Sequence, residues 1–340
     1  MKSFHELTPI GQARRLRPMA REALAGFGIQ PTRLSQLTAA TNTIFRVDTA
    51  GGDRVVLRIA SPQSAHSEGE TVSEISWMHA VDQDTDIRIA APVSTRDGRW
   101  VTHHRLDGVP EARLCSVFRW VPGAMLADRL TETNVARHGE LAARLHLHGR
   151  SYRPPSDFRI RAYDNVFAYS DPGFPVSEPI RLFDTGSDAR LSESQRRLFR
   201  RITDHIQGAI DRLHASETRP QVIHNDLHVW NVKIHRDQAI ALDFEDLLWG
   251  YPVQDIATSL YYYRFREDGA TLCAAYRSGY ERVAPWPEEK EGQIETLIIG
   301  RALLLANFVV ASPNAEDRAF APIYVERTET RLRAYASAHL

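Results

Sequence analysis

The sequence predicts an α+β protein with two lobes: a small antiparallel β-sheet in the N-terminal lobe and mainly α-helices in the C-terminal lobe. Three observations lead to this prediction. Residues 44–48 and 54–59 alternate apolar and polar side chains around Gly51-Gly52-Asp53, which is the pattern of a β-hairpin. Residues 253–338 follow helical spacing over most of their length. Residues 221–246 hold further short apolar runs separated by polar residues.

The composition is that of an ordinary globular chain and argues against several classes of partner. The 340 residues are 43% hydrophobic and 25% charged with a formal net charge of −1, so no overall field attracts nucleic acid or an anionic membrane. Two cysteines, Cys115 and Cys273, make no disulfide framework, so we expect a cytoplasmic protein. Residues 1–15 lack the apolar core of a signal peptide. The tract 297–311 is interrupted by Arg301 among others and is expected to be a buried helix rather than a membrane span.

The remaining elements of the N-terminal lobe follow from local pattern. Residues 9–26 are rich in Ala, Leu, Met and Arg, which favours a helix, and residues 64–81 have helical spacing with Ile75 and Met78 facing inward. The lobe boundary is expected near Pro122, which gives an N-lobe over 1–121 and a C-lobe over 122–340. Short apolar runs beside turns predict further strands at residues 32–37, 89–93, 100–106 and 114–121.

The C-terminal lobe is predicted to be helical around the 221–246 stretch. Residues 151–187 are rich in proline and aromatic residues and are expected to form a loop that either shapes a substrate mouth or pads the lobe. Helical spacing predicts helices at residues 131–147, 191–213, 253–265, 269–283, 287–311 and 316–338.

The stretch 221–246 is predicted to be a strand, a polar loop and a short hairpin. Val222 and Ile223 end abruptly at His224, an alternating run resumes at residues 232–234, and a second apolar run at 240–242 leads directly into Asp243. A hairpin here would hold Asp226, Asn231 and Asp243 near one end. Hard oxygen ligands of this kind suit Mg²⁺, and one carboxylate remains to receive a proton.

The same stretch carries the motif of a known family. The frame His224-x-Asp226-Leu227-x-x-x-Asn231, followed by Asp243-Phe244-Glu245, fits the protein-kinase pattern H-R-D-L-x-x-x-N and D-F-G, except that Asn225 replaces Arg and Glu245 replaces Gly. The second histidine, His228, matches the H-G-D-L-H-x-x-N wording of small-molecule kinases. The chain therefore resembles the aminoglycoside phosphotransferase and choline kinase family. Within that family it is most similar to the bacterial stress-response kinase and the type II homoserine kinase.

The resemblance implies a two-lobed protein-kinase-like fold that uses ATP and Mg²⁺. Asp226 would accept or orient the proton of an acceptor hydroxyl, and Asn231 and Asp243 would hold Mg²⁺. Arg58 stands where kinases have a lysine for the phosphates, and Glu74 is its expected partner. Glu70 and Glu68 compete for that role, because the sequence does not determine the rotation of the helix. An exposed, unpaired Arg58 is the alternative.

Two further segments of the N-lobe are candidates for nucleotide contacts. The turn at residues 38–43 has no glycine, but Thr41 and Asn42 can donate to phosphate oxygens, and a plain polar turn is the alternative. The backbone from Arg119 to Val121 stands where the family's inter-lobe connector pairs with the adenine edge. A strand that simply ends in a turn is the alternative there.

The family resemblance leaves the acceptor open. The first hypothesis is transfer of the γ-phosphate to the hydroxyl of a small molecule such as an amino alcohol, a sugar or an aminoglycoside. The alternatives are a protein Ser/Thr kinase of the stress-response type and a nucleotide-binding pseudokinase scaffold. The segment between Asp246 and Pro252 is too short for a phosphorylatable activation segment, which favours a small molecule. Trp230 departs from the family's small residue and is a candidate to line the acceptor site.

Overall fold

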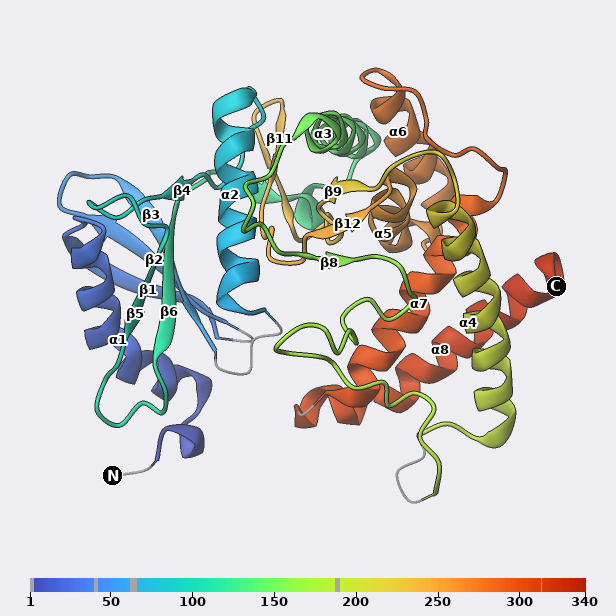
Figure 1. The fold of residues 1–340 in the computed structure, drawn as a ribbon, viewed down its shortest axis with the longest axis horizontal. Coiled ribbons are helices and arrows are strands. Elements are labelled where there is room, and N and C mark those ends of the chain that lie inside the picture. Colours follow the sequence, from blue (N-terminus) through green and yellow to red (C-terminus); the bar gives the residue numbers. More distant parts are fainter. Residues whose placement is uncertain (1–2, 40–41, 62–65, 187–189, 313) are drawn as a thin grey trace. The chain divides into compact units, whose positions relative to one another are not determined.

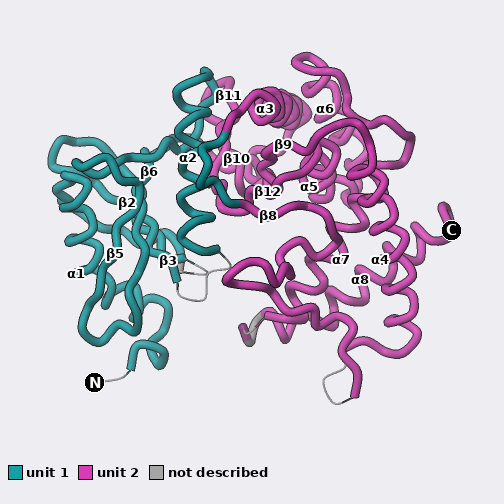
Figure 2. The backbone as a smooth tube through the Cα atoms, viewed as in Figure 1, with its two compact units in different colours: residues 1–123, 154–159 teal, residues 124–153, 160–340 magenta. Residues whose placement is uncertain are grey.

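The N-terminal part of the chain combines an antiparallel sheet with helices and helices dominate the rest, so the predicted α+β class is confirmed (Figure 1). The structure is a computed structural model, and it describes residues 3–39, 42–61, 66–186, 190–312 and 314–340. It divides into two units. The first comprises residues 1–123 and 154–159, and the second comprises residues 124–153 and 160–340 (Figure 2).

A six-stranded sheet forms the body of the first unit. Its order is β1-β2-β3-β6-β4, with β5 also paired to β6. The predicted hairpin is formed by β2 and β3, which pair from Asn42↔Ala60 to Asp48↔Arg54. Gly52 in its turn has φ of +88°, a conformation that glycine adopts without steric cost. The strands are β1 (Pro31–Ala39), β2 (Asn42–Thr49), β3 (Arg54–Ala60), β4 (Pro92–Val93), β5 (Val101–His104) and β6 (Arg113–Arg119).

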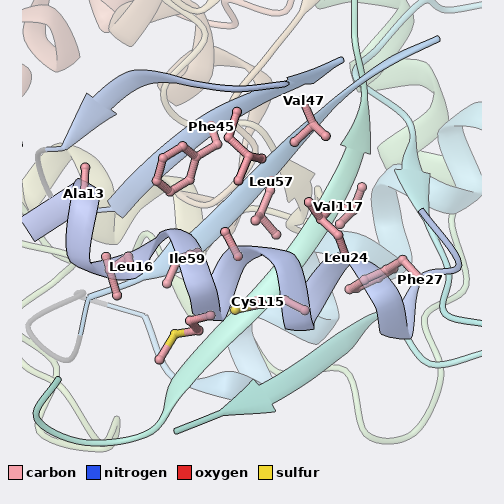
Figure 3. Packing of buried hydrophobic residues seen from close by; sticks show 14 of the residues in the cluster. Ala13, Leu16, Leu24, Phe27, Phe45, Val47, Leu57, Ile59, Cys115 and Val117 are labelled. Atoms are coloured by element: carbon pink, nitrogen blue, oxygen red, sulfur yellow. The ribbon is translucent and has the colours of Figure 1, made fainter. Parts of the chain in front are cut away.

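Helix α1 (Pro9–Gly26) covers one face of this sheet and builds the core of the unit. A short 3₁₀ turn (Phe4–Glu6) precedes it, and the side chain of Thr8 caps it by accepting from the Gly11 amide. Its buried side chains recur at helical spacing, and Figure 3 shows Leu16 and Leu24 packed against strand residues such as Leu57. The helix lies where the sequence predicts it.

Helix α2 (Glu68–Asp84) belongs to the same unit and begins with a capping box. The side chain of Ser67 accepts from the Glu70 amide, and the Glu70 carboxylate accepts from the Ser67 amide at 2.8 Å. Its inner face carries Ile75 and Met78, as predicted, and also the carboxylate of Glu74.

Within the described residues of the second unit, six α-helices make up most of the structure. Helix α7 is buried along most of its length and packs against α4, α5 and α8. By length and composition alone it would pass as a membrane span, but 72% of that stretch is buried inside the structure, which confirms the predicted buried helix. The helices are α3 (Glu132–Ser151), α4 (Glu193–His214), α5 (Pro252–Arg264), α6 (Gly269–Glu281), α7 (Gln293–Ala311) and α8 (Ala315–His339), with a 3₁₀ turn at Leu126–Arg129.

Two small sheets of the second unit frame the 221–246 stretch. Strands β10 and β11 form the predicted hairpin, and β7 pairs with the outer side of β10. Strand β9 pairs antiparallel with β12, which β8 joins from the other side. The strands are β7 (Ala124–Met125), β8 (Arg161–Ala162), β9 (Gln221–Ile223), β10 (Val232–His235), β11 (Gln238–Ala241) and β12 (Leu248–Gly250).

Candidate active site

The β10–β11 hairpin places Asn231 and Asp243 at the same end. Val232 pairs with Ala241 across the ladder, and the Leu242 amide donates to the Asn231 carbonyl at 2.9 Å. Asn231 therefore lies opposite Leu242, directly beside Asp243. The two residues thus stand at the same end of the hairpin backbone, and the convergence of their side chains on Mg²⁺ stays a prediction.

Asp226 projects from the loop between β9 and β10 and is tied to Asn231. The Asn231 Nδ2 donates to the Asp226 Oδ2 at 2.8 Å and to the Asp226 carbonyl at 2.9 Å. On the other oxygen, the Arg301 Nη2 donates to Oδ1 at 2.5 Å. The Asp226 side chain is 15% exposed, so it is held by neighbours on both oxygens and still reaches solvent.

Burial and charge act in opposite directions on Asp226. Removal from water raises the pKa of its carboxyl to about 7, and the Arg301 guanidinium limits that rise. The negative charges of Asp246 and Glu245 contribute to this raised pKa, because they disfavour a second ionised carboxylate nearby. A carboxyl whose pKa lies near neutrality is suited to exchange a proton with a substrate hydroxyl.

Asp255 of α5 holds the loop that carries Asp226 through backbone hydrogen bonds. Its carboxylate accepts from the Asn225 amide at 2.7 Å and from the His224 amide at 3.2 Å, and His146 donates to it at 2.9 Å. Burial would raise the pKa of Asp255, but hydrogen bonds from His146 and the loop outweigh burial and lower it. Asn225 has φ of +62°, so the loop keeps a left-handed turn immediately before Asp226.

His224 links the loop to the hairpin rather than pointing to a substrate. It is fully buried, its Nε2 donates to the Leu242 carbonyl at 3.0 Å, and its Nδ1 accepts from the Asp226 amide at 3.3 Å. Burial lowers its pKa, so the ring is neutral. Its contacts are those of a structural residue.

His228, Trp230 and Tyr262 form an aromatic group beside Asp226. The His228 Nε2 lies 3.5 Å from the Asp226 Oδ2, and its ring packs edge-on against both Trp230 and Tyr262. Trp230 is 56% exposed and also contacts Tyr262, with ring centroids 5.6 Å apart. That Trp230 lines the acceptor site stays a prediction, as does the same role for residues 151–187.

In the first unit, Arg58 and Glu74 form a buried, two-pronged ion pair. The Arg58 Nη1 and Nη2 donate to the two carboxylate oxygens of Glu74 at 3.0 and 2.6 Å, and its Nε donates to Ser116. Glu74 is therefore the partner among the three candidates. Glu70 is engaged in the capping box at Ser67, and Glu68 lies 3.3 Å from His103.

The other nucleotide candidates are located only in part. Thr41 lies outside the described residues, whereas Asn42 is buried at the start of β2. The Arg119 amide donates to the Ala91 carbonyl at 2.7 Å, so that donor is already used within the first unit. An adenine contact by Arg119 or Val121 stays a prediction, to which Arg119 can contribute its carbonyl.

The donor set suits magnesium better than a transition metal. Within the described part of the chain, no three His, Cys, Asp or Glu side chains gather as a metal cluster. Asn231 has an amide oxygen to offer, because its Nδ2 is turned to Asp226, and Asp243 adds a carboxylate at the same hairpin end. Mg²⁺ is commonly bound through one or two carboxylates together with substrate phosphates. Asn231 and Asp243 therefore fit such an ion.

Arg301 is the site residue that sequence reasoning did not single out. It belongs to α7, it is buried, and it reaches Asp226 across 75 positions of the chain. The available signal was one arginine inside the apolar tract 297–311, where a buried charge requires a partner.

The fold and the loop together define the class of kinase-like phosphotransferases. Residues 33–290 match the model of the phosphotransferase enzyme family. The chain belongs to this family, and the predicted resemblance is confirmed. An uncharacterised protein of Synechocystis sp. is 24% identical over 258 residues, which is 75% of this chain and 66% of that protein. The match thus spans slightly less than two thirds of that relative.

Several solved structures share the fold. A microcompartment-associated aminopropanol kinase has a TM-score of 0.79 at 22% identity, covering 95% of this chain and 98% of its own. An amicoumacin kinase in complex with AMP-PNP and Ca²⁺ has a TM-score of 0.74 at 18% identity, covering 93% of both chains. An aminoglycoside phosphotransferase in a ternary complex with ADP and hygromycin B has a TM-score of 0.60 at 14% identity, covering 91% and 96%.

Proposed function

We propose that this protein transfers the γ-phosphoryl group of ATP, with Mg²⁺, to a hydroxyl group of a small molecule such as an amino alcohol, a sugar or an aminoglycoside. The observation that carries the proposal is the position of Asp226. Its carboxylate is oriented by Asn231 on one oxygen and by Arg301 on the other, beside the hairpin end that carries Asp243.

Asp226 is the residue that meets the acceptor hydroxyl. A carboxylate offers about four acceptor positions, and Asn231 and Arg301 occupy only one on each oxygen. The acceptor hydroxyl would donate to a remaining position and lose its proton there as the new oxygen–phosphorus bond forms. In the same step, the bond between the γ-phosphorus and the β-phosphate oxygen of ATP breaks, and ADP leaves.

Asn231 and Asp243 are proposed to hold Mg²⁺. When bound, the ion supplies positive charge that neutralises the phosphate oxygens. Asn231 has a second task in this arrangement, since its amide nitrogen keeps the Asp226 carboxylate turned toward the acceptor. The same side chain therefore couples the orientation of the base to the metal-binding end of the hairpin.

The first unit is proposed to bind the nucleotide through Arg58. Glu74 accepts from two of its nitrogens, which leaves the guanidinium in one fixed orientation. An arginine fixed in this way can donate to the non-transferred phosphates of ATP. Asn42, together with Thr41, is proposed to contribute further donors to phosphate oxygens, and the backbone at Arg119 and Val121 to meet the adenine.

The acceptor class is supported by the short chain between Asp246 and Pro252 and by the family. The similar structures include proteins named as kinases of aminopropanol and amicoumacin and one bound to hygromycin B. All three names refer to small molecules, and aminopropanol carries both a hydroxyl and an amino group. We extend that class to this chain as the proposal.

A direct assay tests the proposal. ADP formation from ATP is measured with aminopropanol, a sugar panel, hygromycin B and a protein substrate as acceptors, in the presence and absence of Mg²⁺. The wild type is expected to phosphorylate at least one small molecule. Asp226→Asn is expected to lose about 10²–10⁴-fold in rate while binding ATP normally. Asp237→Asn, which changes an 89% exposed carboxylate, is the control and should retain full activity.

Two outcomes would overturn the proposal. Full activity of Asp226→Asn would remove its role as the proton acceptor. Phosphorylation of the protein substrate alone would move the chain to the class of protein kinases.

A further inference from the structure

Arg301 is a charged residue in the apolar interior of α7. Its side chain is 7% exposed, and its neighbours Ile299 and Leu303 are buried. Placing a guanidinium in such an interior is costly unless a carboxylate pairs with it. For folding alone, apolar residues of similar volume often serve as well as a buried ion pair or better. Stability therefore gives little reason for an arginine here.

The contacts of Arg301 are directed at the catalytic loop. Its Nη2 donates to the Asp226 Oδ1 at 2.5 Å, and the guanidinium also interacts electrostatically with the hydroxyl of Tyr262 on α5. Its Nε is buried with no hydrogen-bond partner. The Arg301 side chain is thus oriented so that Nη2 contacts Asp226, although this orientation leaves Nε without a hydrogen bond.

Arg301 is the cation that Asp226 contacts in the described part of the chain. The other basic side chain at the carboxylate is His228, whose Nε2 lies 3.5 Å from Oδ2. Burial and, after it, the nearby Arg301 guanidinium lower the pKa of His228 to about 4, so the ring is neutral near pH 7. Positive charge at the carboxylate therefore comes from α7 and not from the catalytic loop.

The ion pair orients Asp226 without blocking it. Arg301 occupies one acceptor position of Oδ1, and Asn231 occupies one of Oδ2. About two acceptor positions of the carboxylate remain. Two fixed donors on opposite oxygens define the plane of the carboxylate, so the directions of the remaining positions are defined as well.

We propose that Arg301 is a positioning residue of the transfer reaction, holding the Asp226 carboxylate from helix α7 in the orientation in which it receives the acceptor hydroxyl. This inference rests on the proposed function. A displacement of about 1 Å at a reacting group can cost about 10²-fold in rate, and that sets the size of the expected effect.

The test compares Arg301→Met and Arg301→Lys with a matched control. Arg264→Met is the control. It removes the ion pair of Arg264 on α5 with Glu295 on α7, which does not involve Asp226. ADP formation from MgATP is measured with aminopropanol and with water as the only acceptor. Arg301→Met is expected to lower kcat about 10²-fold with an unchanged KM for ATP. Arg301→Lys should recover part of kcat because it keeps the charge but loses the planar fork. Arg264→Met should match the wild type.

A double-mutant cycle separates positioning from a general structural role. If Arg301 acts through Asp226, adding Arg301→Met to Asp226→Asn lowers kcat no further. Multiplication of the two losses would overturn the inference. Should Arg301→Met fail to fold, Arg301→Lys decides: reduced kcat at unchanged thermal stability supports the inference, and full kcat refutes it.

The cycle also distinguishes this inference from the proposed function. An Asp226→Asn enzyme with full activity would end the proposed function and the inference together. An impaired Asp226→Asn beside a fully active Arg301→Met would leave the proposed function standing and remove only the role of Arg301.

Discussion

The Asp255 carboxylate accepts a hydrogen bond from the Asn225 amide at 2.7 Å, at the residue where the loop between β9 and β10 takes a positive φ of 62°. The same carboxylate receives the His224 amide and His146. A left-handed residue other than glycine costs about 1–3 kcal/mol and persists only where its surroundings enforce it. Asp255 provides that enforcement from helix α5.

Replacing Asp255 should therefore destabilise the fold strongly. Asp255→Ala leaves two buried amides and His146 without their acceptor, and we expect a loss of about 3–5 kcal/mol in the free energy of unfolding. Asp255→Asn keeps one acceptor oxygen and should lose less. Urea denaturation followed by circular dichroism measures both. The control is Asp237→Ala, which removes an exposed partner of Arg137 and should leave stability unchanged. An Asp255→Ala protein as stable as this control would contradict the prediction.

The Arg58–Glu74 pair yields a prediction about nucleotide binding. Glu74→Gln keeps the shape of the side chain but removes the charge that orients Arg58. Hydrogen bonds to charged groups contribute about 1.5–3 kcal/mol, so we expect ATP affinity to fall at least about tenfold. Isothermal titration calorimetry with MgATP measures the change. Glu68→Gln, on the same helix but beside His103, is the control and should bind ATP normally. Equal affinities for the two variants would show that Arg58 does not need Glu74 to bind phosphate.

The hairpin of the site could be predicted because the sequence pattern that specifies it lies within one short segment. Asn231 and Asp243 are twelve positions apart, and strand alternation with one turn is enough to bring them together. The choice of Glu74 was left open because helix rotation is a tertiary property. One local signal was present, however: Ser67-x-x-Glu70 is a capping-box pattern, and the structure uses Glu70 for that purpose.

Arg301 could not be assigned from the sequence for a different reason. Its partner Asp226 lies 75 positions earlier, and the contact exists only because α7 packs against α5 beside the catalytic loop. An arginine in an apolar tract predicts that a partner exists, but the sequence does not identify that partner. Tertiary packing also accounts for β1, which continues to Ala39 along β2 instead of ending at residue 37 as predicted.

His138 leads to a prediction about pH and stability. Burial lowers its pKa to about 3, and the ring is neutral, with Nε2 donating to the Leu227 carbonyl and Nδ1 accepting from Tyr263. The unfolded chain takes up the proton near pH 6.5, whereas the folded chain does not take it up until about pH 3. Stability from this residue is therefore complete above pH 6.5 and falls by about 1.4 kcal/mol per pH unit below it.

The free energy of unfolding at pH 7.5 and pH 5.5 measures this effect. His138→Phe should be less stable at pH 7.5, because the Leu227 carbonyl loses one of two donors and the Tyr263 hydroxyl loses its acceptor. It should nevertheless lose less stability on acidification than the wild type. Leu141→Ala, a core change on the same helix without a titrating group, should keep the wild-type pH dependence. Identical pH dependence for His138→Phe and Leu141→Ala would contradict the assignment.

Gly139 of α3 allows α3 and α6 to pack with their backbones in contact. A Cβ at Gly139 would overlap the carbonyl oxygen of Tyr276, and one at Gly279 of α6 would overlap the carbonyl oxygen of Ala136. Because the obstacle is backbone, the helices must separate, and we expect Gly139→Ala to cost at least about 1–3 kcal/mol. Gly208→Ala on α4 meets only the end of the Arg212 side chain at 3.5 Å and should gain about 0.5–1 kcal/mol from helix propensity. Thermal unfolding of the two variants should therefore shift in opposite directions. A stabilised Gly139→Ala protein would contradict the close approach of the α3 and α6 backbones.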